Sequence, residues 1–125
     1  MLESLRLRVT DALKAESAAT LSTTGPGGIQ AGYFASEAEC LTLYLLVPDT
    51  SDVLFNLEKE SGVIVTTPRW QLEGRAEVHA LFQAPVSLQL ARSPLSAGCV
   101  LVAVYLRRIH LNWEEGWGYR ETIDC

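Results

Sequence analysis

The residues best suited to chemistry in this sequence surround a predicted helix start at Thr50 and Ser51. These hydroxyl residues precede a stretch that predicts a helix from residue 50 to about residue 60, with an apolar stripe at Val53, Leu54 and Leu57. A helix N-terminus carries unpaired backbone N–H groups and a partial positive charge, so it favours an anion such as a phosphate. Thr50 and Ser51 are therefore candidate phosphate ligands; the competing interpretation is that they only cap the helix.

A second candidate group is the aromatic stretch from Trp113 to Arg120, which reads Trp-Glu-Glu-Gly-Trp-Gly-Tyr-Arg. Its rings, including Trp117, offer flat surface that could stack on a ring system. The competing interpretation is that Trp70, Trp113 and Trp117 pack in the core or in a dimer interface. For Arg69 and Arg120 the alternatives are a contact with a ligand and an ion pair at the surface.

The cysteines and histidines do not form a recognisable catalytic or metal site. The cysteines are odd in number and widely spaced (Cys40, Cys99 and Cys125), which is typical of free thiols in a reducing compartment. The two histidines, His79 and His110, lack the spacing of a metal-ligand pair. We therefore predict no metal site, and no side chain is identified as a catalytic acid, base or nucleophile.

Composition limits the kind of partner. The chain has 125 residues, 48% of them hydrophobic, which suits one folded domain spanning residues 1–125. Its net charge of −5 argues against nucleic acid and against an anionic membrane surface as partners. No apolar run approaches the roughly 20 residues of a membrane-spanning helix, and no signal-peptide pattern opens the sequence. We expect a cytoplasmic protein that binds a small molecule.

The elements that must position these residues are mostly strands. Alternating or β-branched apolar patterns predict strands at residues 18–24, 29–36, 41–47, 62–67, 74–80 and 100–113. Glycines at 25–28 predict a hairpin turn, and helices are predicted at residues 2–15, 50–60 and 85–91. In the last strand, simple alternation places Arg107 on one face with Ile109, and Arg108 on the other with Leu106. The fold class is therefore mainly β: a six-stranded antiparallel barrel with flanking helices.

Several short motifs follow one another in a characteristic order and spacing. They are Ala18-Ala-Thr-Leu-Ser-Thr23, Leu43-Tyr44-Leu45, Asn56-Leu57, the Gly-x-Ala of Trp70–Ala76, and Ile109-His-Leu-Asn-Trp113. Together they resemble the pyridoxamine 5′-phosphate oxidase-like, FMN-binding split barrels. The resemblance runs from about Ala18 to Trp117, and it implies a six-stranded split barrel that forms homodimers with flavin in a groove between the subunits.

The resemblance also implies where the flavin phosphate would bind. In that family an arginine on the second strand and a Ser/Thr-Arg-Lys run at the helix start hold the phosphate. The matching positions here are Gln30 or Ala31, and Ser51-Asp52-Val53, so the hydroxyl is kept and the cations are missing. Each lost charge-assisted hydrogen bond costs roughly 1.5–3 kcal/mol, and two or three together weaken binding on the order of thousands-fold.

Other positions match the family better. Arg69 corresponds to a contact with the polar edge of the isoalloxazine, and Thr67 lies beside it at the end of the central strand. Trp113 and Arg120 correspond to the C-terminal tryptophan and arginine that face flavin and substrate from the partner subunit. We therefore expect the cofactor contacts to come from Thr50, Ser51, Thr67, Arg69, Trp113, Trp117 and Arg120.

Two functions follow from this pattern. The first is a flavin-dependent (FMN) oxidoreductase that acts on an unknown small substrate. The second is a split barrel that has lost flavin and serves as a binding or structural module. The sequence leaves open whether a deazaflavin or haem replaces FMN.

Overall fold

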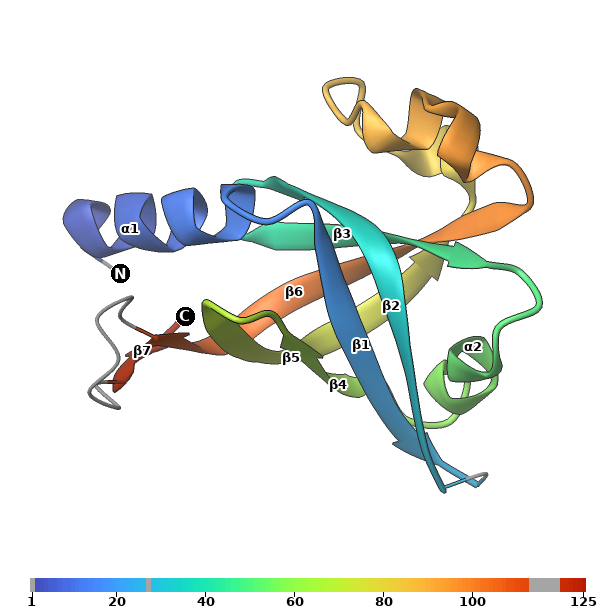
Figure 1. Ribbon diagram of the computed structural model, residues 1–125, viewed down its shortest axis with the longest axis horizontal. Coiled ribbons are helices and arrows are strands. Elements are labelled where there is room, and N and C mark those ends of the chain that lie inside the picture. The colour runs from blue at the N-terminus through green and yellow to red at the C-terminus, as the bar shows by residue number, and fades with distance from the viewer. Residues whose placement is uncertain (1, 27, 113–119) are drawn as a thin grey trace.

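The computed structural model describes residues 2–26, 28–112 and 120–125, and its centre is one antiparallel sheet that closes on itself (Figure 1). The strand order is β3-β2-β1-β4-β5-β6-β7, and a further pairing of β3 with β6 closes the first six strands into a barrel. This confirms the predicted fold class. The bounds are β1 (Ala18–Gly25), β2 (Gly28–Glu39), β3 (Thr42–Pro48), β4 (Gly62–Thr66), β5 (Trp70–His79), β6 (Cys99–Asn112) and β7 (Arg120–Asp124).

Two helices lie at opposite ends of the barrel in Figure 1. Helix α1 (Glu3–Lys14) buries Val9 and Leu13 in the core that the inward-facing strand residues form. The indole Nε1 of the fully buried Trp70 donates to the carbonyl of Ala12 at 2.9 Å, which ties this helix to β5. Trp70 is therefore a core residue.

Helix α2 (Asp52–Leu57) is shorter than the sequence predicts. Its stripe is buried at Val53, and the fully buried Asn56 faces the hairpin of β1 and β2. The Asn56 Nδ2 donates to Thr23 Oγ1 at 3.1 Å and to the Gly28 carbonyl at 3.2 Å. The helix therefore fastens the hairpin to the end of the barrel.

Several strand boundaries differ from the predictions. Strand β2 continues beyond residue 36 to Glu39, because the reversal is made in a tight turn at Cys40, whose φ is 54°. Strand β5 begins at Trp70 and not at residue 74, directly after a turn in which the Thr67 amide donates to the Trp70 carbonyl at 2.9 Å. Strand β7 was not predicted.

The predicted helix at residues 85–91 is wrong, because prolines at 85 and 94 break the segment into three 3₁₀ turns. These turns are η1 (Leu81–Gln83), η2 (Leu90–Arg92) and η3 (Pro94–Ser96). Leu88 packs against Leu46 and Leu101 on the outer side of β3 and β6. The Glu37 carboxylate accepts the amides of Gln89 and Leu90, which holds the segment against the barrel.

A β-bulge overturns the predicted alternation of the last strand. Glu73 of β5 pairs with Arg108 of β6, but the next residue, Gly74, pairs with Leu106. Arg107 is thus an extra residue on β6, so Leu106 and Ile109 both pack against the core while Arg107 and Arg108 are both exposed and line one groove. Simple alternation fails here because a bulge arises from the pairing of two distant strands.

Candidate functional site: a groove on the outer face of the barrel

A groove of about 670 Å³ lies on the outer face of the barrel, across strands β1, β4, β5 and β6, with Ile29 of β2 and Asp124 of β7 also in its lining. Strand alternation sends Ser22 and Thr24 outward, because the alternate residues Leu21 and Thr23 are buried. In the part of the chain that the structure describes, neither outward hydroxyl has a hydrogen-bond partner. This wall of the groove can therefore donate to or accept from a ligand.

The same wall also carries apolar surface. Ile29 of β2 is 77% exposed and Ile64 of β4 is 42% exposed, and both line the groove. Ser22 pairs with Ile64 on one side and with Ala31 on the other, so hydroxyl and apolar groups alternate across these strands. A flat ring with polar edges fits such a wall.

The opposite wall is charged. Glu73, Arg108 and Asp124 stand side by side in one cross-strand row. The Arg108 Nε donates to Asp124 Oδ1 at 2.6 Å. This hydrogen bond, with the charges of Asp124 and Glu73, raises the pKa of the Arg108 guanidinium above its usual value. The Arg108 guanidinium therefore already interacts with carboxylates of the same chain.

His110 lies beside the groove in a chain of polar contacts that the sequence did not reveal. Its Nε2 is 3.0 Å from Glu73 Oε2, and its Nδ1 is 2.8 Å from Thr122 Oγ1. If the carboxylate accepts the Nε2 proton, Nδ1 accepts the Thr122 hydroxyl proton. The outward polar positions of β5 and β6 are visible in the sequence, but His110 and Thr122 meet only through strand β7.

The structure places Thr50 and Ser51 at the start of α2, away from this groove. Thr50 is exposed in the turn, and Ser51 occupies the N-cap position without a side-chain capping hydrogen bond. The helix that follows is six residues long and has the exposed Asp52 in its first turn. Val53 is 2% exposed, so a cation at that position would point into the core rather than toward a ligand.

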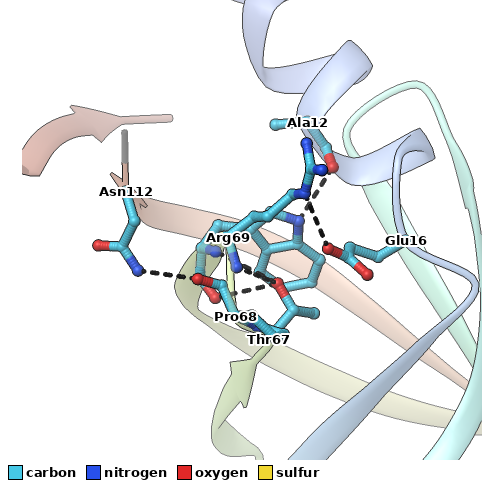
Figure 2. A network of polar contacts seen from close by, with 7 residues as sticks. Ala12, Glu16, Thr67, Pro68, Arg69 and Asn112 are labelled. Atoms are coloured by element: carbon cyan, nitrogen blue, oxygen red, sulfur yellow. Dashed lines mark hydrogen bonds and ion pairs between the residues drawn. The ribbon is translucent and has the colours of Figure 1, made fainter. Parts of the chain in front are cut away.

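Thr67 and Arg69 belong to the turn between β4 and β5, which Figure 2 shows in detail. The Thr67 hydroxyl is buried and accepts the amides of Arg69 and Trp70, each at 3.2 Å. The exposed Arg69 side chain reaches Glu16, with Nε 3.6 Å from Oε1. The backbone N–H of Asn112 donates to the Arg69 carbonyl at 2.8 Å, so this turn joins the end of α1 to the end of β6.

The predicted residues are therefore not all brought together within one chain. The helix start precedes β4 and the Thr67–Arg69 turn follows it, so the two groups lie at opposite ends of that strand. Trp113 and Trp117 lie outside the described residues. Arg120 begins strand β7, and its side chain is likewise outside the description.

Solved structures share this fold. General stress protein 26 from Bacillus anthracis is 17% identical, with a TM-score of 0.70 over 97% of this chain and 98% of that chain. A putative pyridoxamine 5′-phosphate oxidase from Listeria innocua is 14% identical, with a TM-score of 0.65 over 86% and 97%. A heme binding protein from Mycobacterium smegmatis is 15% identical, with a TM-score of 0.66 over 93% of this chain and 57% of that chain.

These similarities define the fold: the chain is a split barrel of the kind found in pyridoxamine 5′-phosphate oxidase-like proteins. No family model matches the sequence, and no curated protein matches it. Within the described ranges, no helix is long and apolar enough to cross a bilayer, and no group of three or more His, Cys, Asp or Glu side chains could hold a metal ion.

Proposed function

We propose that this protein binds a flavin, FMN or a close relative, in the outer-face groove and carries out redox chemistry on a small substrate. The observation that supports the proposal is the groove itself, whose apolar and hydroxyl-bearing wall lies on the open face of a split barrel. Its volume of about 670 Å³ is in the ordinary range for cofactor pockets. Proteins of similar fold include a putative pyridoxamine 5′-phosphate oxidase.

In this proposal the flavin supplies the hydride chemistry when it is bound. The residues of the chain bind it, orient it and exclude water. Ile29 and Ile64 would contact the ring system, and Ser22 and Thr24 would hydrogen-bond its polar edge. His110, whose two ring nitrogens contact Glu73 and Thr122, would hold the polar side chains beside the groove in place.

We also propose that the protein is a homodimer with this face in the interface. Tyr33 of β2 is 73% exposed and points to the same side as Ile29 and Ile64, so three large apolar side chains are exposed on this face of the sheet. A second copy would cover this apolar surface and close the open side of the groove. The helix start of one subunit and the Thr67–Arg69 turn of the other could then contribute to the same site.

The test is the absorption spectrum of the purified protein, followed by its melting temperature in increasing FMN. A flavin at about 100 times its Kd stabilises the native state by roughly 2.7 kcal/mol, which raises the melting temperature of a domain of this size by about 10 °C. Absence of a flavin spectrum, together with an unchanged melting temperature at high micromolar FMN, would refute the proposal. A haem spectrum would instead indicate the ligand named for the Mycobacterium smegmatis protein.

The second candidate function is a binding or structural module without flavin. Asp52 supports it, because this residue places a negative charge where the family resemblance locates the phosphate. Asp52→Arg tests that location, with Asp49→Arg as a matched control in the preceding turn. Tighter FMN binding in Asp52→Arg, but not in Asp49→Arg, would indicate a decayed phosphate site at the start of α2. Stoichiometric flavin in the purified wild-type protein would exclude this second candidate function.

A further inference from the structure

The β-bulge creates a pair of neighbouring arginines on one face of the sheet. In a regular strand, consecutive side chains point to opposite faces. Because Arg107 is the extra residue between the Glu73–Arg108 and Gly74–Leu106 pairs, it is exposed together with Arg108, and both line the groove. Bulges commonly re-aim a side chain beside a binding site.

Among the described residues, Arg107 differs from its neighbours in having no ion pair. Arg108 is bonded to Asp124, and Arg75 lies 3.9 Å from Glu77. Among the described residues, no carboxylate lies within salt-bridge distance of the Arg107 guanidinium, and no hydrogen bond occupies it. Its charge is therefore available to a ligand in the groove.

The acidic side chains that line the groove already have partners other than Arg107. Asp124 is paired with Arg108, and Glu73 is in hydrogen-bond contact with His110. The Cys125 thiol also lines the groove, and burial, with the nearby charge of Asp124, raises its pKa. The thiol therefore stays protonated at neutral pH and adds no negative charge.

The separation of the two walls selects an elongated ligand. Ser22 on β1 and Arg107 on β6 are three strand spacings apart, because β4 and β5 lie between them. At about 4.8 Å per spacing this is roughly 14 Å along the sheet. A ligand that contacts both must carry its ring system and its anionic group at opposite ends.

We propose that Arg107 binds the phosphate of a ligand whose ring system lies over Ser22 and Ile64. This inference rests on the proposed function for the identity of the ring, and it deepens that function by assigning the phosphate contact. It places the phosphate on β6 rather than at the start of α2, where the sequence has Ser51-Asp52-Val53 in place of cations. Arg107 therefore discriminates FMN from riboflavin, which lacks the phosphate.

The experiment compares the dissociation constants of FMN and riboflavin for the wild-type protein, Arg107→Gln and Arg75→Gln. Arg75 is the matched control, since it is an exposed arginine on the neighbouring strand that does not line the groove. Arg107→Gln is expected to weaken FMN binding by roughly 10- to 100-fold and to leave riboflavin binding unchanged. Arg75→Gln is expected to leave both constants unchanged.

Asp124→Asn provides a second, independent test, in which FMN binding is expected to become tighter. It removes the carboxylate that occupies Arg108, so a second guanidinium becomes available and FMN should bind several-fold more tightly while riboflavin does not. If both flavins bind and Arg107→Gln leaves the ratio of their constants at the wild-type value, the assignment of Arg107 is overturned while the proposed function stands. If the wild-type protein binds neither flavin, both are overturned.

Discussion

At the scale of single residues, buried polar side chains hold helix α2 and the β4–β5 turn in place. Asn56 is fully buried and gives both Nδ2 hydrogens to the β1–β2 hairpin, one to a side chain and one to a carbonyl. Thr67 performs a similar task at the opposite end of β4, where its hydroxyl accepts two backbone amides. Such groups are costly to remove, because their partners are left buried and unsatisfied.

Asn56→Ala is expected to destabilise the protein by about 2–4 kcal/mol, since two buried hydrogen bonds and the packing of the side chain are lost. Chemical denaturation measures this change. Asn112→Ala is the matched control, because its Nδ2 makes one exposed contact, 3.4 Å from the Pro68 carbonyl. Equal loss of stability in the two variants would show that the hairpin does not depend on Asn56.

The sequence showed Asn56 as part of a motif but did not reveal which groups its side chain hydrogen-bonds. Its partners Thr23 and Gly28 are 33 and 28 residues distant, and only the folded chain brings them together. Ser51 and Thr50 show the reverse. Their position at the start of a helix follows from local patterning, which left Thr50, Ser51 and Asp52 as candidate caps, and the structure places Ser51 at the N-cap without a side-chain capping hydrogen bond.

At the scale of elements, the pairing of β5 with β6 determines what the groove contains. Gly74 allows the bulge, because a Cβ at this position would lie 2.6 Å from the Tyr105 carbonyl oxygen and 2.8 Å from Val104 Cγ1. The two strands can approach only if residue 74 has no side chain. The bulge leaves Arg107 exposed together with Arg108.

Gly74→Ala is expected to destabilise the protein by about 1–3 kcal/mol, because the backbone of β6 must move to relieve the clash. The melting temperature should fall accordingly. Gly62→Ala is the control: a Cβ there meets only the flexible end of Glu60, with Oε1 at 3.1 Å, so little change is expected. A Gly74→Ala protein as stable as the Gly62→Ala protein would contradict the close approach of the two strands.

At the scale of the whole molecule, an open apolar face favours self-association. Ile29, Tyr33 and Ile64 are exposed on the strands that also form the uncharged wall of the groove. The outer side of β3 and β6 differs, because the segment of 3₁₀ turns already covers it. The proposed dimer therefore uses the uncovered side of the barrel.

Ile64→Glu should convert the proposed dimer to a monomer, since it would place two like charges close together in a buried apolar contact across the two-fold axis. Light scattering at micromolar concentration measures the mass. Phe82→Glu is the control, because Phe82 is 88% exposed but lies in the 3₁₀ segment. A wild-type protein that is monomeric at this concentration would refute the dimer.

Local patterning by itself determined most of the architecture. Alternating and β-branched runs located the six barrel strands, the Gly-rich turn located the first hairpin, and the apolar spacing in residues 2–15 located α1. These features depend on residues that are close in sequence, so the sequence reveals them directly. The predicted mainly β barrel is confirmed for this reason.

The tertiary structure decided which side chains share the groove and which polar groups meet, because these contacts depend on which strands pair and in what register. The bulge that exposes both Arg107 and Arg108, the contact of His110 with Thr122, and the burial of Asn56 under a distant hairpin all arise from pairings between separate segments. Local periodicity contains no information about register. The sequence therefore predicted the barrel, while only the folded chain showed the groove and the cation available within it.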